Sequence, residues 1–163
     1  MADAGELSDN AARIAERIAD IAGEMGWTVA VAESLTSGSI AGRLGAAREA
    51  SSWFAGGVVA YASEVKFKVL DVDPGPVVTA VCAAQMARGV ARLMDADFAV
   101  AVTGVGGPAA DEGHPAGTVF LAISSSSGEE VGHHQFDGDP SQVVKLATVF
   151  ALQRLLTALE DMR

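Results

Sequence analysis

Hydrophobic positions along the chain follow two repeat lengths, one typical of helices and one typical of buried strands. Apolar side chains recur every three or four residues from Ile14 to Met25, which predicts a helix that a polar run at 8–10 caps and Gly26 ends. Short apolar runs with β-branched residues predict strands. The predicted strands are 27–33, 53–62, 97–104, 117–124 and 129–138, and the later helices are 39–47, 63–72, 77–95 and 139 to the end.

Helices and strands alternate along most of the chain, and two strands adjoin near the C-terminus. The stretch SSSSG between these two strands predicts a hairpin, and Asp139 with Pro140 predicts the capped start of the last helix. This order indicates an α/β fold, a three-layer α/β/α domain with a mixed, mostly parallel sheet. The chain has 163 residues and no repeat or long linker, so we expect a single domain over 1–163 with its core at about 10–160.

Composition narrows the classes of partner. Eleven basic against twenty-one acidic residues give a net charge of −10, and such a surface repels nucleic acid. The single cysteine, Cys82, lies in a helical pattern and is expected to be a small buried side chain in a reducing compartment. The N-terminus lacks the apolar core of a secretory signal, and no apolar run approaches membrane-spanning length. We therefore expect a cytoplasmic protein with no membrane partner.

The stretch AVAESLTSGSIAGRL, residues 30–44, is the first candidate for chemistry. Ser34 follows a predicted strand, at the sheet edge where open α/β folds bind ligands. The first amides of the following helix could hold an anion or an oxyanion. Two interpretations stay open at this point: Ser34 is a nucleophile, or it belongs to an ordinary Ser/Thr helix cap.

A nucleophilic serine needs a base, and the histidines are poor candidates. His133 and His134 are neighbours on a predicted strand and must face opposite ways, and His114 lies in a Gly/Pro loop without ligand spacing. A Ser-His-Asp triad and a metal site therefore find no support. Lys66 is the remaining candidate, because burial and a helix N-terminus would favour its neutral form. The alternative is an exposed surface lysine.

The segment AVTGVGGPA, residues 101–109, ends a predicted strand in glycines. It matches a loose dinucleotide-binding pattern, but Pro108 and Pro115 forbid the helix that such a site requires. A nest of backbone N–H groups near an anion or a reacting oxygen is the functional interpretation, and a tight turn is the alternative. Thr103 adds a hydroxyl group at the end of the strand.

Four segments in this order resemble the CinA C-terminal domain family, which includes nicotinamide-nucleotide amidases of the PncC type: AESLTSG (32–38), SSWFAGGVVAYASEVKFKVLDV (51–72), AVTGVGGP (101–108) and PAGTVFLAI (115–123). The resemblance implies an amidase that converts nicotinamide mononucleotide to nicotinate mononucleotide and ammonia, without metal or cofactor. It assigns Ser34 as nucleophile, Lys66 as general base, and Tyr61 and Thr103 as supporting residues. The implied substrate-binding residues are Thr36, Ser37, Gly38, Gly104, Gly106 and Gly107.

The chain departs from the family pattern at several positions. Leu35 and Ser37 replace a Cys and a Gly, and Ala62 and Ser63 stand where Ser and Asn are common. Residues 138–140 read GDP where the family has GDR, so Pro140 removes an Arg expected to contact substrate. A charge-assisted contact of that kind is worth about 1.5–3 kcal/mol.

The family resemblance and the positions that differ from the family motif leave two candidate functions. The first is the amidase with a small-molecule nucleotide as substrate. The second is a weakly active or inactive nucleotide-binding or interaction domain of the same fold. We also expect a homo-oligomer, a dimer, because dimers are the commonest assembly of soluble proteins.

Overall fold

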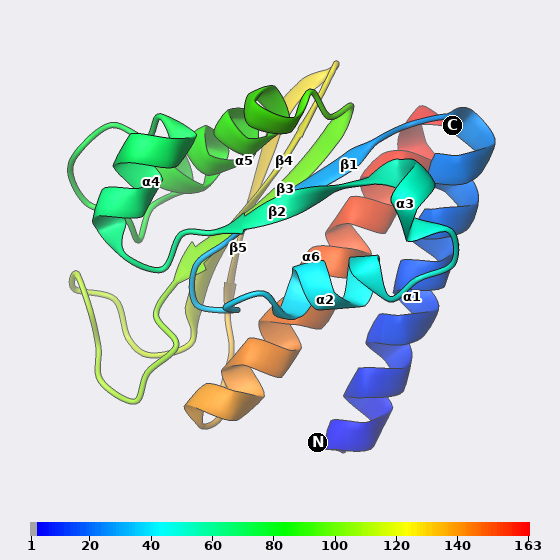
Figure 1. The fold of residues 1–163 in the computed structure, drawn as a ribbon. Helices are drawn as coiled ribbons and strands as arrows, with labels where there is room; N and C mark the ends of the chain where they lie inside the picture. Colours follow the sequence, from blue (N-terminus) through cyan, green and yellow to red (C-terminus); the bar gives the residue numbers. More distant parts are fainter. Residues whose placement is uncertain (1–2) are drawn as a thin grey trace.

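A five-stranded sheet with helices on both faces forms the domain (Figure 1). The computed structural model describes residues 3–163. The helices are α1 (Ala4–Met25), α2 (Ser39–Gly45), α3 (Ala50–Trp53), α4 (Ser63–Leu70), α5 (Ala80–Met94) and α6 (Pro140–Met162). The strands are β1 (Val29–Glu33), β2 (Phe54–Val59), β3 (Phe98–Gly104), β4 (Thr118–Ser125) and β5 (Gly128–Gln135).

The strand order β2-β1-β3-β4-β5 confirms the predicted mixed sheet. Strand β1 pairs in parallel with β2 and β3, whereas β4 is antiparallel to both β3 and β5. Four of the five strands therefore run in one direction. The carboxyl ends of β1, β2 and β3 meet at one edge of the sheet, where ligands of open α/β sheets usually bind.

The two faces of the sheet bury side chains of different size. Along β1 and β3, valine and alanine alternate, so all the larger side chains point to one face. The Val face packs against α1, α2 and α6, and the Ala face packs against α4 and α5. Figure 1 shows these two helix layers on opposite sides of the sheet. The small alanines let α5 lie close to the strands.

A glycine in α5 also lets α4 approach closely. A Cβ atom added to Gly89 would lie 2.0 Å from the carbonyl oxygen of Leu70, the last residue of α4. This contact is possible only without a side chain at position 89. It fixes the C-terminal end of α4, the helix that carries Lys66.

Several element boundaries differ from the sequence predictions. Helix α1 begins at Ala4, so the predicted cap at residues 8–10 is wrong. The cause is a capping box between Asp3 and Glu6, in which the Asp3 amide donates to the Glu6 carboxylate at 3.1 Å. Helix α5 begins three residues later than predicted, because the Thr79 hydroxyl caps it by accepting the Cys82 amide at 3.0 Å. The short helix α3 was not predicted.

Helix α6 differs from the expectation about apolar runs. Among the described residues it is the one helix long and apolar enough to cross a membrane by length and composition. Half of its most apolar window is buried inside the domain, where it packs against α1 and the sheet. That packing is typical of a core helix.

Substitution of Gly89 by Ala is predicted to destabilise the domain by about 1–3 kcal/mol, because the new methyl group must push α4 away. The matched control is Gly23→Ala in α1, where nothing lies within 4 Å of the added Cβ. That change is expected to stabilise by roughly 0.5–1 kcal/mol, the usual gain from Gly to Ala in a helix. Urea unfolding of both variants measures the effects. Equal free-energy changes of the same sign would show that Gly89 has no steric role.

Candidate active site

The turn that carries Ser34 is held by the residue before it. Glu33 is fully buried, and its two carboxylate oxygens accept the backbone amides of Ile40 and Ala41, each at 2.9 Å. These two amides open α2, so a side chain of the protein already fills the anion position at this helix N-terminus. The amides of Ile40 and Ala41 are therefore not available to a ligand, and for these two the expectation that the first amides of α2 could hold a bound anion or an oxyanion is wrong. We call these two hydrogen bonds the Glu33 clamp. Ser34 follows Glu33 directly and is 7% exposed.

Lys66 is buried and contacts Ser34. Its side chain is 1% exposed, and its Nζ atom lies 3.1 Å from Ser34 Oγ. The same Nζ donates to the carbonyl oxygens of Ala60 at 2.7 Å and Tyr61 at 3.1 Å. Lys66 is therefore not a surface lysine, and the distance between its amine and the Ser34 hydroxyl is within hydrogen-bond reach.

Burial lowers the pKa of Lys66 below its ordinary value of 10.5. Negative charge on Cys82 or Glu112 would raise this pKa and opposes the effect of burial. Cys82 is itself buried, which raises the pKa of its thiol to about 11, so at neutral pH the thiol is uncharged. The opposing charge at neutral pH is then that of Glu112.

The three contacts of Lys66 suit either protonation state. A charged amine has three N–H donors and can donate to Ser34 Oγ and to both carbonyls. In the neutral amine, the carbonyls of Ala60 and Tyr61 can take the two remaining donors, which leaves the lone pair for the Ser34 hydroxyl proton. This is the arrangement that a general base needs before a serine attacks.

A pocket of about 390 Å³ opens beside this pair. Its lining includes Ser34, Lys66, Tyr61, Thr103 and the segment 104–107. The structure thus brings together all four residues that the resemblance assigned to catalysis, and the three assigned glycines Gly104, Gly106 and Gly107. The residues Thr36, Ser37 and Gly38, assigned to substrate binding, do not line this pocket.

The two supporting residues contribute in different ways. Thr103 is buried, and its hydroxyl donates its proton to the carbonyl of Val77 at 2.8 Å. Its oxygen can therefore only accept a further hydrogen bond. Tyr61 holds Lys66 through its main chain, while its side chain is 67% exposed at the pocket.

Glu112 is a site residue that the sequence interpretation missed. Its carboxylate accepts the amides of Val77 at 3.0 Å and Val78 at 2.7 Å, and so holds the segment whose carbonyl orients Thr103. Glu112 adopts a positive φ of 48° in the loop after β3. Nothing in the local pattern of that loop distinguishes Glu112 from the acidic residue beside it, so only its contacts reveal its role.

None of the three histidines lines the Ser34 pocket, and each packs on an aromatic ring. His133 stacks on Phe120, whereas His134 packs against Phe136 and Phe150 on the other face of β5. This confirms that the two neighbours point in opposite directions. His114 packs edge-on against Phe120.

Position 140 lies beside a residue that lines the pocket. A Cβ added to Gly107 would lie 3.9 Å from Pro140 Cγ, and Gly107 lines the pocket. Pro140 is the first residue of α6, whose cap Asp139 accepts the Gln142 amide at 2.9 Å, as the sequence predicts. A side chain longer than proline at this position would start next to the glycine segment.

Comparison with known proteins decides the family. The model of the CinA C-terminal domain matches residues 11–159. The chain belongs to this family. A relative named competence-damage inducible protein from Bacillus subtilis (strain 168) is 39% identical over 143 residues, which are 85% of this chain and 34% of that protein. A CinA-like protein from Frankia casuarinae is 39% identical over 142 residues, 82% of this chain and 33% of that protein.

The chain therefore spans about a third of the length of the curated relatives it matches. Solved CinA structures match it over nearly their whole length. Competence damage-inducible protein A from Klebsiella pneumoniae has a TM-score of 0.90 and 32% identity, over 94% of this chain and 99% of that one. A CinA superfamily protein from Escherichia coli has a TM-score of 0.88 and 32% identity, over 96% of this chain and 92% of that one.

Substitution of Glu33 by Gln is predicted to lower the free energy of unfolding by about 1.5–3 kcal/mol, since a neutral amide cannot accept both α2 amides. The control is Glu64→Gln, an exposed acidic residue in the first turn of α4. Urea unfolding at neutral pH compares the two variants. If both variants lose the same small amount of stability, Glu33 does not hold the turn.

Proposed function

We propose that this CinA-family domain is an amidohydrolase that deamidates nicotinamide mononucleotide to nicotinate mononucleotide and ammonia. One observation carries the proposal: the buried Lys66 amine lies 3.1 Å from Ser34 Oγ at the edge of a pocket. Burial lowers the pKa of this lysine, and a lysine that can lose its proton beside a serine hydroxyl can act as a base beside a nucleophile. The family resemblance supplies the substrate.

In the proposed acylation step, Lys66 takes the hydroxyl proton as Ser34 Oγ bonds to the carboxamide carbon. The carbonyl electrons move to oxygen, and the backbone amides of Gly106 and Gly107, which line the pocket, stabilise the resulting negative charge. The C–N bond then breaks, and Lys66 returns its proton to the departing nitrogen, which leaves as ammonia. The acceptor-only oxygen of Thr103 orients the carboxamide N–H groups.

In the proposed deacylation step, water attacks the ester carbon while Lys66 takes one of the water protons. The bond from carbon to Ser34 Oγ breaks, and Lys66 returns the proton to Ser34. Throughout this cycle the carbonyls of Ala60 and Tyr61 keep the amine in place. The exposed ring of Tyr61 at the pocket supplies a surface on which a pyridine ring can stack.

A second candidate function is a nucleotide-binding or interaction domain with little or no catalysis. Pro140 favours it, because a residue without charge or donor stands beside the glycine segment of the pocket. The intact Ser34–Lys66 contact favours the amidase. The cytoplasmic location and the homodimer expected from the sequence remain predictions.

The amidase proposal predicts that purified protein releases ammonia from nicotinamide mononucleotide. Ser34→Ala and Lys66→Arg should each lower kcat by about 10³-fold or more. The first change removes the nucleophile, and the second replaces a base that can lose its proton with a guanidinium that stays charged. The exposed Lys68→Arg, in the same helix, is the control and should keep full activity. Activity should rise with pH, with its midpoint at the lowered pKa of Lys66 and a plateau above it. Folded wild-type protein without turnover rejects the amidase.

A second prediction concerns position 140. Pro140→Arg should raise kcat/KM for nicotinamide mononucleotide about ten- to hundredfold, the equivalent of one charge-assisted contact. Pro140→Gln is the control, since it also restores a long side chain without charge. If Arg and Gln behave alike, charge at this position does not contribute to the reaction.

A further inference from the structure

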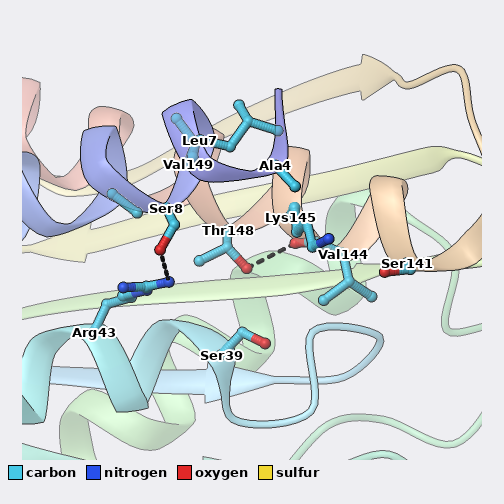
Figure 2. Close-up of a pocket in the computed structure, with 11 residues that line it drawn as sticks. Ala4, Leu7, Ser8, Ser39, Arg43, Ser141, Val144, Lys145, Thr148 and Val149 are labelled. Atoms are coloured by element: carbon cyan, nitrogen blue, oxygen red, sulfur yellow. Dashed lines mark hydrogen bonds between the residues drawn. The ribbon is translucent and has the colours of Figure 1, made fainter. Parts of the chain in front are cut away.

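A second cavity, of about 520 Å³, lies between α1, α2 and the start of α6 (Figure 2). It shares no lining residue with the Ser34 pocket. Its volume is within the range of about 300–1,000 Å³ typical of small-molecule sites. Nothing in the proposed amidase reaction uses this cavity.

The lining combines apolar surface with hydroxyl groups. The apolar part is Ala4, Leu7, Ala11, Val144 and Val149, and the hydroxyls are those of Ser8, Ser39, Ser141 and Thr148. Figure 2 shows the Ser39 hydroxyl from α2 and the Ser141 hydroxyl from α6 around the same space. A mostly apolar wall with a few polar groups is typical of a ligand pocket.

Arg43 and Lys145 are the charged residues of the lining, and none of the described residues that line the cavity carries a carboxylate. Elsewhere in the described part of the chain, six arginines form ion pairs with carboxylates: Arg17, Arg48, Arg88, Arg92, Arg154 and Arg163. Over residues 3–163, neither Arg43 nor Lys145 has such a partner. The two cations give this cavity a positively charged lining in a protein with a net charge of −10, and such a lining attracts an anion.

Ser8 holds Arg43 toward this cavity. Its hydroxyl oxygen accepts the Nη2 group of Arg43 at 2.8 Å, from α1 across to α2. The sequence suggests Ser8 as part of a helix cap, but α1 begins earlier and leaves its side chain free for this contact. Arg43 keeps its other N–H donors for a ligand, in an orientation that is already set.

We propose that this cavity binds a phosphate monoester that carries an apolar group. The dianionic phosphate matches the two positive charges of Arg43 and Lys145, and the serine hydroxyls donate to its oxygens. The apolar group lies on Leu7, Ala11 and the valines of α6. The site is separate from the Ser34 pocket, and the proposal does not depend on the amidase activity.

An NMR titration of the ¹⁵N-labelled full chain with phenyl phosphate tests the proposal. Saturable shifts are expected at the amides of Ser8, Ser39, Arg43 and Lys145, with weaker binding at higher salt. Inorganic phosphate and phenol should each bind more weakly, because one lacks the apolar group and the other lacks the charge. Benzoate should bind more weakly than phenyl phosphate, since it carries a single charge.

Variants identify the groups responsible. Arg43→Gln with Lys145→Gln should weaken phenyl phosphate binding by at least about tenfold, whereas Lys68→Gln, outside the cavity, should not change it. Ser8→Ala keeps both charges and should weaken binding less, and the dispersed spectrum of each variant shows that it is folded. Absence of saturable shifts, shifts only around Ser34 and Gly106, or unchanged affinity in the double variant would each overturn the proposal.

Discussion

A buried lysine amine in contact with a serine hydroxyl is the chemical centre of this domain. Lys66 loses nearly all its water, which disfavours the charged form, and it gains two carbonyl acceptors and one hydroxyl group. In the neutral form, two of these partners can take the N–H donors of the amine and the Ser34 hydroxyl can donate to its lone pair. The same burial that makes this residue costly for stability makes it suitable as a base.

Different elements of the fold position Ser34 and Lys66. Ser34 is placed by β1 and by the clamp between the buried Glu33 carboxylate and the first amides of α2. Lys66 is placed by α4, which packs on α5 at Gly89, and α5 in turn packs on the alanine face of the sheet. Small residues at these positions are therefore part of the site, because they set how closely the helix carrying Lys66 approaches the strand carrying Ser34.

Much of this could be predicted from the sequence, and the failures have physical causes. The short apolar runs at β1 and β3, the helical repeat after Ile14 and the alternation of helices and strands predicted the layers of the fold. The site residues lie 32 positions apart, so no local pattern pairs Ser34 with Lys66; elimination of the histidines made Lys66 a candidate base, and the family resemblance assigned it. The clamps made by Glu33 and Glu112 join a carboxylate to backbone amides of another segment. Such contacts depend on tertiary structure and leave no local pattern.

Membership of the CinA C-terminal domain family agrees with the fold and with the position of the pocket, and it leaves the protonation state of the lysine as the central question. The chain contains only three lysines, Lys66, Lys68 and Lys145, so lysine labelled with ¹³C at Cε can be followed through a pH titration by NMR. The structure predicts that the resonance assigned by the Lys66→Arg variant titrates with a pKa below 10.5, because burial disfavours its charge. A Lys66 midpoint at or above 10.5 would mean that the amine is a charged donor to Ser34, and it would contradict the role of Lys66 as a neutral base.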